Sequence, residues 1–133
     1  MTGMATSPKH FLAGRDVLLV EDETAISFLI EDMLAEMGVA SVRHAARLDK
    51  ALALVADKAP SLAVLDVNVA GELVFPVAER LAQAKVPFLF MTGYGRGGIV
   101  ERWAASEVLQ KPFTPVAFES ALRQLVSTAT TTD

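Results

Sequence analysis

Five chemically active side chains stand at the ends of short apolar runs in this chain of 133 residues: Glu21, Asp22, Asp66, Thr92 and Lys111. Carboxylates ~4 Å apart repel by up to ~4 kcal/mol at an effective dielectric near 20, so a group of three persists where a cation compensates it or where one acid stays protonated. Oxygen ligands without histidine or cysteine suit Mg²⁺, which keeps several of its waters. If one edge of the fold gathers these acids, the sequence predicts a magnesium site there.

A metal held in this way leaves room for a phosphoryl oxygen, and the other side chains have matching chemistry. Lys111 can neutralise a second phosphoryl oxygen, and the Thr92 hydroxyl can bond to the third. Asp66 is then placed to act as a nucleophile and form an aspartyl phosphate. The protein needs only to position these groups and balance their charge for such a transfer.

The apolar runs that carry these residues are short and continuous, which is typical of strands buried on both faces. Segments with helical periodicity lie between them. We expect five strands near 17–20, 41–42, 62–65, 88–91 and 108–109, and five helices near 24–37, 48–55, 74–81, 99–103 and 118–125. Strict alternation implies right-handed crossovers and helices on both faces. The predicted α/β fold is therefore a flavodoxin-like, doubly wound five-stranded parallel sheet of order 2-1-3-4-5, whose ligands bind at the carboxyl ends of the strands.

Composition narrows the class of protein. Hydrophobic residues make up 52% of the chain, which excludes a disordered sequence, and the length suits one domain. The net charge of −4 disfavours a nucleic-acid partner, which needs a basic face. Cysteine is absent, the apolar runs are too short to span a bilayer, and the N-terminus lacks a signal-peptide core. We expect a cytoplasmic protein without membrane insertion, with one domain at 14–127 and flexible tails at 1–13 and 128–133.

The order of these motifs resembles the receiver domain of bacterial response regulators. The resemblance rests on Glu21-Asp22, Asp66, Thr92 and Lys111-Pro112-Phe113, and it covers about residues 15–127. The stretches 65–68 and 88–95 are similar to the subgroup nicknamed FATGUY. Each motif alone is common, but five in this order at five strand ends are specific.

The resemblance implies a single-domain response regulator of a two-component phosphorelay, a phosphoacceptor rather than an enzyme. Asp66 would accept a phosphoryl group from the phosphohistidine of a sensor histidine kinase or a histidine phosphotransfer protein. Glu21, Asp22, Asp66 and the backbone carbonyl of Asn68 would arrange Mg²⁺, and Thr92 and Lys111 would bind the phosphoryl group. The signal would leave by binding a downstream protein target or by onward phosphotransfer. In the family, the bond equivalent to Lys111-Pro112 is usually cis.

The chain departs from the family pattern at two places that bear on signalling. Three residues before Lys111, where most receivers carry an aromatic switch residue, stands Val108. Tyr94 is the candidate substitute for that ring. Ala70 stands four residues after Asp66, where most receivers have proline, and the turn that follows it is expected to be short.

The two histidines, His10 and His44, are not expected to take part in the chemistry. Neither is predicted to lie at the edge of the sheet that gathers the acids.

Two other functions remain open at this point. A haloacid-dehalogenase-type phosphatase also uses an aspartate nucleophile and Mg²⁺, but its second acid would stand at the position of Asn68, which cannot act as a general acid or base. A receiver-like module that is never phosphorylated and only binds partners is the other alternative. The complete set of acids, Thr92 and Lys111 argues against it.

Overall fold

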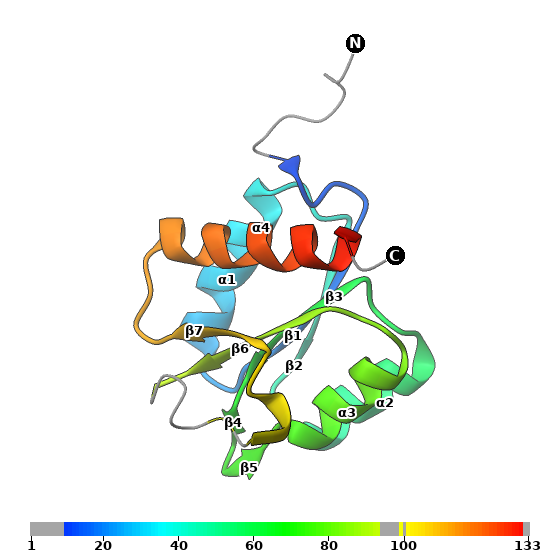
Figure 1. The fold of residues 1–133 in the computed structure, drawn as a ribbon. Helices are drawn as coiled ribbons and strands as arrows, with labels where there is room; N and C mark the ends of the chain where they lie inside the picture. The colour runs from blue at the N-terminus through cyan, green and yellow to red at the C-terminus, as the bar shows by residue number, and fades with distance from the viewer. Residues whose placement is uncertain (1–9, 94–98, 100, 132–133) are drawn as a thin grey trace.

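A five-stranded parallel sheet forms the centre of the protein (Figure 1). The structure is a computed structural model that describes residues 10–93, 99 and 101–131, without the side chains of 128–131. The strands are β1 (Asp16–Val20), β2 (Ser41–Ala45), β3 (Leu62–Asp66), β6 (Phe88–Thr92) and β7 (Glu107–Gln110). Their order is β2-β1-β3-β6-β7, which is 2-1-3-4-5 when only these five strands are counted. The predicted flavodoxin-like fold is confirmed.

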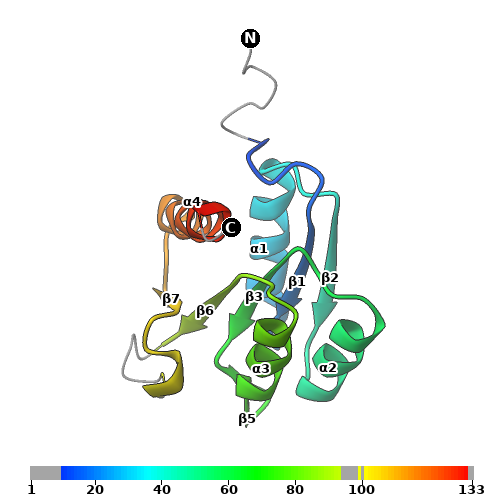
Figure 2. The same ribbon diagram turned by 45° about the vertical axis from the view of Figure 1, so that its right-hand side comes forward.

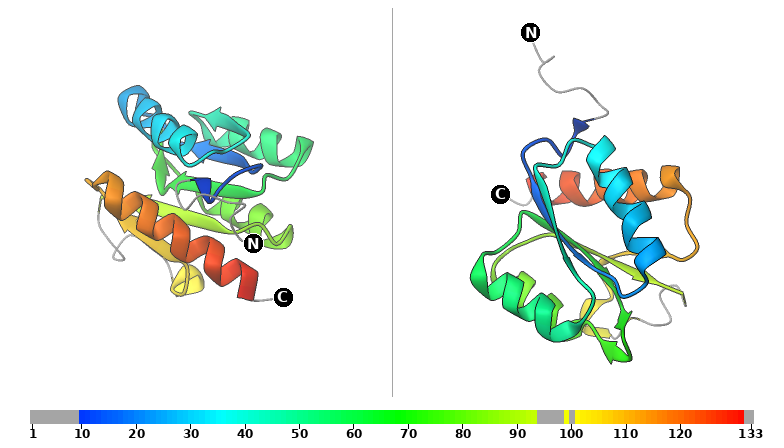
Figure 3. Two further views of the ribbon diagram at one scale, coloured as in Figure 1. Left: turned by 90° about the horizontal axis from the view of Figure 1, so that it is seen from above. Right: turned by 180° about the vertical axis from the view of Figure 1, so that it is seen from behind.

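Helices cover both faces of this sheet (Figure 2). One face carries α1 (Thr24–Glu36) and α4 (Pro115–Thr131), and the other carries α2 (Leu48–Asp57) and α3 (Phe75–Gln83). Views from above and from behind show the same two helical layers (Figure 3). Each layer closes its own core cluster against the sheet.

The central strands are buried on both faces, so polar side chains are expected only at their carboxyl ends, where the candidate site lies. In β1, Val17 and Leu19 pack under α1 and α4, whereas Leu18 and Val20 pack under α2 and α3. All five residues of β3 are buried. A strand with both faces covered needs apolar residues until it leaves the helical layers. Asp66, the last residue of β3, is therefore the first position at which a carboxylate is tolerated.

The prediction of a fourth helix at 99–103 needs correction. Among the residues that the structure describes, the segment expected at 99–103 contains only a short 3-10 helix, η4 (Glu101–Trp103). Gly95, Gly97 and Gly98 precede the expected segment and β7 begins at Glu107, so little chain is left for a longer helix, because glycine costs about 1 kcal/mol in a helix interior. Trp103 is buried instead against the aromatic rings of Phe88 and Phe90.

The turn after Asp66, which the sequence predicted to be short, is a two-residue turn within a β-hairpin. Strands β4 (Asn68–Val69) and β5 (Glu72–Leu73) pair antiparallel, with Ala70 at φ 52° and Gly71 at φ 86° between them. Two residues with positive φ are what a two-residue hairpin turn of type I′ requires. The Asn68 Oδ1 accepts a hydrogen bond from the Gly71 amide at 3.1 Å, which helps to hold the turn.

The structure describes ordered contacts outside both ends of the predicted domain at 14–127. Leu12 is fully buried, and its amide donates to the Met37 carbonyl at 3.1 Å, so this residue packs on the core cluster under α1 and α4. The ring of Phe11 lies 4.2 Å from the guanidinium carbon of Arg123 on α4. At the other end, α4 continues to Thr131, past the predicted limit at 127. Phe11 and Leu12 are two adjacent apolar residues in a segment without helical or strand periodicity, so the sequence did not predict this packing.

Candidate functional site

The acidic residues that follow β1 and β3 meet at the carboxyl edge of the sheet. Each of Glu21, Asp22 and Asp66 offers one carboxylate oxygen, and these oxygens lie within 4.8 Å of one another. Parallel pairing of β1 with β3 brings them together, because Val20 is in register with Leu65. Glu21 is fully buried and Asp66 nearly so, whereas Asp22 is exposed.

Lys111 closes this group from the other side. Its Nζ donates to Glu21 Oε1 at 3.0 Å and to Asp66 Oδ2 at 3.2 Å. The residue follows β7, and its amide donates to the Thr92 carbonyl at 2.8 Å, which fixes it beside the end of β6. The peptide bond between Lys111 and Pro112 is cis, as the family resemblance implied.

Charge and burial set the protonation of the site. Burial and the charge of Glu21 together raise the pKa of Asp66 to about 6, because Lys111 offsets them only in part. Burial opposes the charged form of Lys111, but its hydrogen bond to Glu21 and the charge of Asp66 outweigh this and raise the pKa of Lys111. At neutral pH the site therefore holds an ionised Asp66 beside a charged ammonium.

The donor set and charge of this cluster fit a divalent cation. When ionised, the three carboxylates face one ammonium, which leaves an excess of two negative charges. The donors are all hard oxygens, which suit Mg²⁺ rather than a softer transition metal. The orientation of the Glu21 carboxylate is fixed, because its Oε2 also accepts a hydrogen bond from the Glu23 amide at 3.0 Å.

The structure brings some of the predicted site residues into direct contact and leaves others at its rim. Thr92 is the last residue of β6 and is 2% exposed, one position beyond Met91, the register partner of Asp66. Asn68 is exposed, and its side chain is occupied by the Gly71 amide. Its backbone carbonyl is the atom for which the family resemblance implies a role at the metal.

The structure describes only one of the two switch candidates, Val108 and Tyr94. Val108 is half-buried in β7, where it is in register with Phe90 and packs on the same core cluster as Trp103. It has no ring that could rotate. Tyr94 lies outside the described residues.

The sequence did not predict that His44 would lie next to the acidic residues. Strand β2 runs three residues further than the weak apolar pair at 41–42 indicated, so His44 reaches the register position of Leu19. Its Nε2 lies 2.8 Å from the carbonyl oxygen of Glu21. Counting the register of β2 against β1 to the end of the strand would have placed this ring near the acids.

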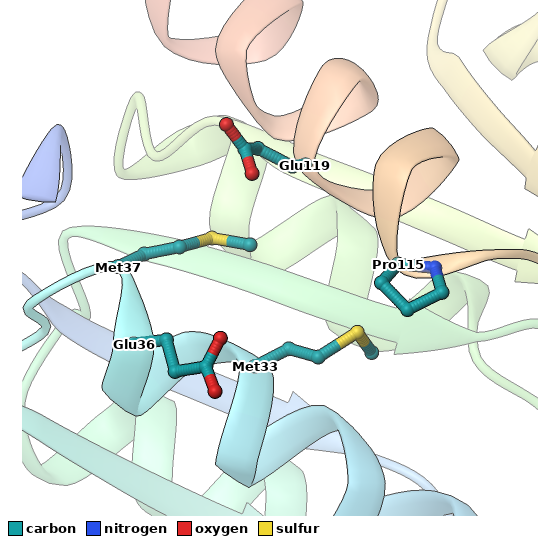
Figure 4. A pocket seen from close by; sticks show the side chains of 5 residues that line it. All are labelled: Met33, Glu36, Met37, Pro115 and Glu119. Carbon is teal, nitrogen blue, oxygen red and sulfur yellow. The ribbon is translucent and has the colours of Figure 1, made fainter. Parts of the chain in front are cut away.

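Two small cavities border α1. The first lies beside the acidic site and is lined by Glu23, Ile26, Leu29, Lys111, Pro112 and Phe113. The second, between α1 and α4, is lined by Met33, Glu36, Met37, Pro115 and Glu119 (Figure 4). Lys111 lines the first cavity, which therefore borders the site, whereas no site residue lines the second. In the part of the chain that the structure describes, no helix combines the length and apolar character needed to cross a membrane.

The chain is similar to known proteins in sequence and in fold. The family model described as "Response regulator receiver domain" matches residues 17–123. The solved structure of SdrG from Sphingomonas melonis Fr1 is similar at 37% identity and a TM-score of 0.71, over 85% of this chain and 97% of that one. No curated protein sequence matches the chain.

Two further structures share the fold. The PhyR response regulator REC domain of Erythrobacter litoralis is 27% identical, with a TM-score of 0.74, over 86% of this chain and 92% of that one. NtrX from Brucella abortus is 25% identical, with a TM-score of 0.76, over 90% of this chain but 28% of that one.

Proposed function

The chain belongs to the response regulator receiver domain family, and we propose that it serves a two-component phosphorelay by accepting a phosphoryl group on Asp66. One observation carries this proposal: a single ammonium, Lys111 Nζ, bridges the carboxylates of Glu21 and Asp66 at 3.0 and 3.2 Å. The same geometry would let Lys111 neutralise an oxygen of a phosphoryl group on Asp66.

The transfer is a displacement at phosphorus. A carboxylate oxygen of Asp66 attacks the phosphorus of a phosphohistidine, and an acyl phosphate forms. The bond from phosphorus to the imidazole nitrogen breaks, its electron pair stays on the imidazole, and that ring takes up a proton from water. Lys111 stabilises the charge on one transferred oxygen, and the Thr92 hydroxyl donates to another. Only ionised Asp66 can attack, so its pKa of about 6 makes the transfer slower in more acidic solution.

Glu21, Asp22, Asp66 and the backbone carbonyl of Asn68 would hold Mg²⁺, some directly and some through water. The ion would neutralise the charge on the phosphoryl oxygens. Without it, the excess of negative charge at the cluster repels an incoming phosphoryl group. The three gathered carboxylates support this assignment.

The phosphodonor, a sensor histidine kinase or a histidine phosphotransfer protein, would dock on α1. Phe28 and Leu29 on this helix are 62% and 47% exposed, so two adjacent large apolar side chains lie at the surface. Leu29 also lines the apolar cavity beside Lys111, together with Ile26 and Phe113. A partner that covers these residues would bring its phosphohistidine next to Asp66.

The phosphorylated protein would signal in the cytoplasm, by binding a downstream protein target or by passing the phosphoryl group on. The net charge of −4 argues against direct action on nucleic acid. Since Val108 offers no aromatic ring, we assign the sensing of phosphorylation to Thr92 and Tyr94 instead. The half-buried position of Val108 against Phe90 supports a packing role for this residue.

Turnover of phosphate esters is not expected. A dehalogenase-type phosphatase needs an acid two residues after its nucleophile, and the amide of Asn68 is far too weak an acid to protonate a leaving group. The Asn68 side chain is also occupied in the hairpin turn. The protein is therefore proposed to be a phosphoacceptor and not an enzyme.

Incubation with acetyl phosphate tests this function. With Mg²⁺, intact-mass spectrometry should show one added phosphoryl group on each chain, and chelation of the metal should prevent the addition. Turnover of p-nitrophenyl phosphate should be undetectable. A chain that stays unmodified in the presence of Mg²⁺ would instead be a receiver-like module that only binds partners, and rapid ester turnover would indicate a phosphatase.

A further inference from the structure

We propose that His44 is a positioning residue of the acidic site, because it fixes the peptide unit that joins Glu21 to Asp22. The proposal rests on the function above, in which both acids hold Mg²⁺. The hydrogen bond of His44 is to the backbone of Glu21, and His44 is not part of the acidic cluster, so an effect on Mg²⁺ would pass through that backbone.

The contact is a single well-formed hydrogen bond. His44 Nε2 lies 2.8 Å from the backbone oxygen of Glu21. A carbonyl oxygen can only accept, so Nε2 carries the proton and donates. The same carbonyl belongs to the planar peptide whose nitrogen is that of Asp22. Holding this oxygen therefore sets the direction in which the chain passes from the first acid to the second.

The position of Glu21 explains why a side chain is needed here. The Glu21 amide donates to the Ala45 carbonyl at 3.0 Å, which continues the ladder of β1 and β2 by one bond. Strand β2 ends at Ala45, and the chain turns away toward α2. Glu21 is fully buried, so its carbonyl cannot turn to bulk water and needs a donor inside the protein. The ring of His44 supplies that donor.

With this bond, every polar group of Glu21 is held. The carboxylate oxygens accept from Lys111 Nζ at 3.0 Å and from the Glu23 amide at 3.0 Å. The backbone amide and carbonyl are held by Ala45 and His44. Partners that orient metal ligands in this indirect way commonly change metal affinity by about 10- to 100-fold when they are lost.

Three variants test the proposal. His44→Leu keeps the bulk and removes the donor, whereas His44→Gln places an amide nitrogen at a similar reach. His10→Gln is the matched control at the other histidine. By calorimetric titration, Mg²⁺ should bind His44→Leu about 10- to 100-fold more weakly than wild type. His44→Gln should recover most of the loss, and His10→Gln should bind as wild type does.

A second measurement needs no metal. Amide hydrogen exchange of Glu21 in the metal-free protein should be faster in His44→Leu and restored in His44→Gln. If His44→Leu binds Mg²⁺ as tightly as wild type does, the positioning role is wrong, and a loss of stability in this variant would not rescue it. The proposed function would still stand in that case. If wild type itself does not bind Mg²⁺, the proposed function fails and this inference fails with it.

Discussion

Replacement of Asp66 by asparagine is expected to lower phosphoryl incorporation by at least about 100-fold, because an amide oxygen is a far weaker nucleophile than a carboxylate. The two side chains have nearly the same shape, so the fold should survive. Incorporation from acetyl phosphate with Mg²⁺, followed by intact-mass spectrometry, measures the effect. Circular dichroism of the variant confirms that the sheet and helices remain.

Asp32→Asn is the matched control for this experiment, because Asp32 is an exposed carboxylate on α1 that lies outside the cluster. It should be phosphorylated at the wild-type rate. Labelling of Asp66→Asn to the wild-type extent would show that another residue accepts the phosphoryl group.

The same variant is expected to make the metal-free protein more stable at neutral pH. The pKa of Asp66 is raised from 3.8 to about 6, so the folded chain keeps this proton to a higher pH than the unfolded chain does. Stability is therefore greatest while Asp66 is protonated, and it falls as the pH rises from about 4 to 6. The cost at pH 7 is about 3 kcal/mol, from about 1.4 kcal/mol for each pKa unit. The expected gain of Asp66→Asn is of this size, because the raised pKa already includes the contact with Lys111.

Urea unfolding in the presence of a chelator measures this gain. It should shrink when the pH is lowered from 7 to 4, because wild-type Asp66 is then protonated as well. Mg²⁺ at ten times its dissociation constant should stabilise the wild type by about 1.4 kcal/mol and leave Asp66→Asn much less affected. A gain of equal size at both pH values would mean that the charge of Asp66 does not strain the metal-free site.

The sheet and its acidic edge could be predicted from the sequence because both follow from burial. A strand covered on both faces, such as β3, admits no polar residue until it leaves the core, so Asp66 marks the place where it does. Parallel pairing then brings the strand ends to one edge, where the Lys111 ammonium bridges Glu21 and Asp66. The roles of these residues in phosphotransfer remain predictions.

The parts that could not be predicted depend on contacts between segments distant in sequence. His44 becomes important only through the register of β2 against β1, which places its ring at the Glu21 carbonyl. The hairpin after Asp66 places Ala70 at φ 52°, a conformation that alanine rarely adopts and that local propensity argues against. Leu12 is buried, and its amide is bound by the carbonyl of Met37 at the end of α1. No pattern within residues 1–13 indicates this contact.

A structure of the protein crystallised with Mg²⁺ and beryllium fluoride, which bonds to carboxylates in the shape of a phosphoryl group, tests the central claim most directly. Electron density for the beryllium fluoride group should join one oxygen of Asp66. Mg²⁺ should lie among Glu21, Asp22 and Asp66, with Lys111 and Thr92 on the fluorine atoms. An Asp66 side chain that stays unmodified, with no metal bound beside it at saturating concentrations, would contradict the phosphoacceptor role.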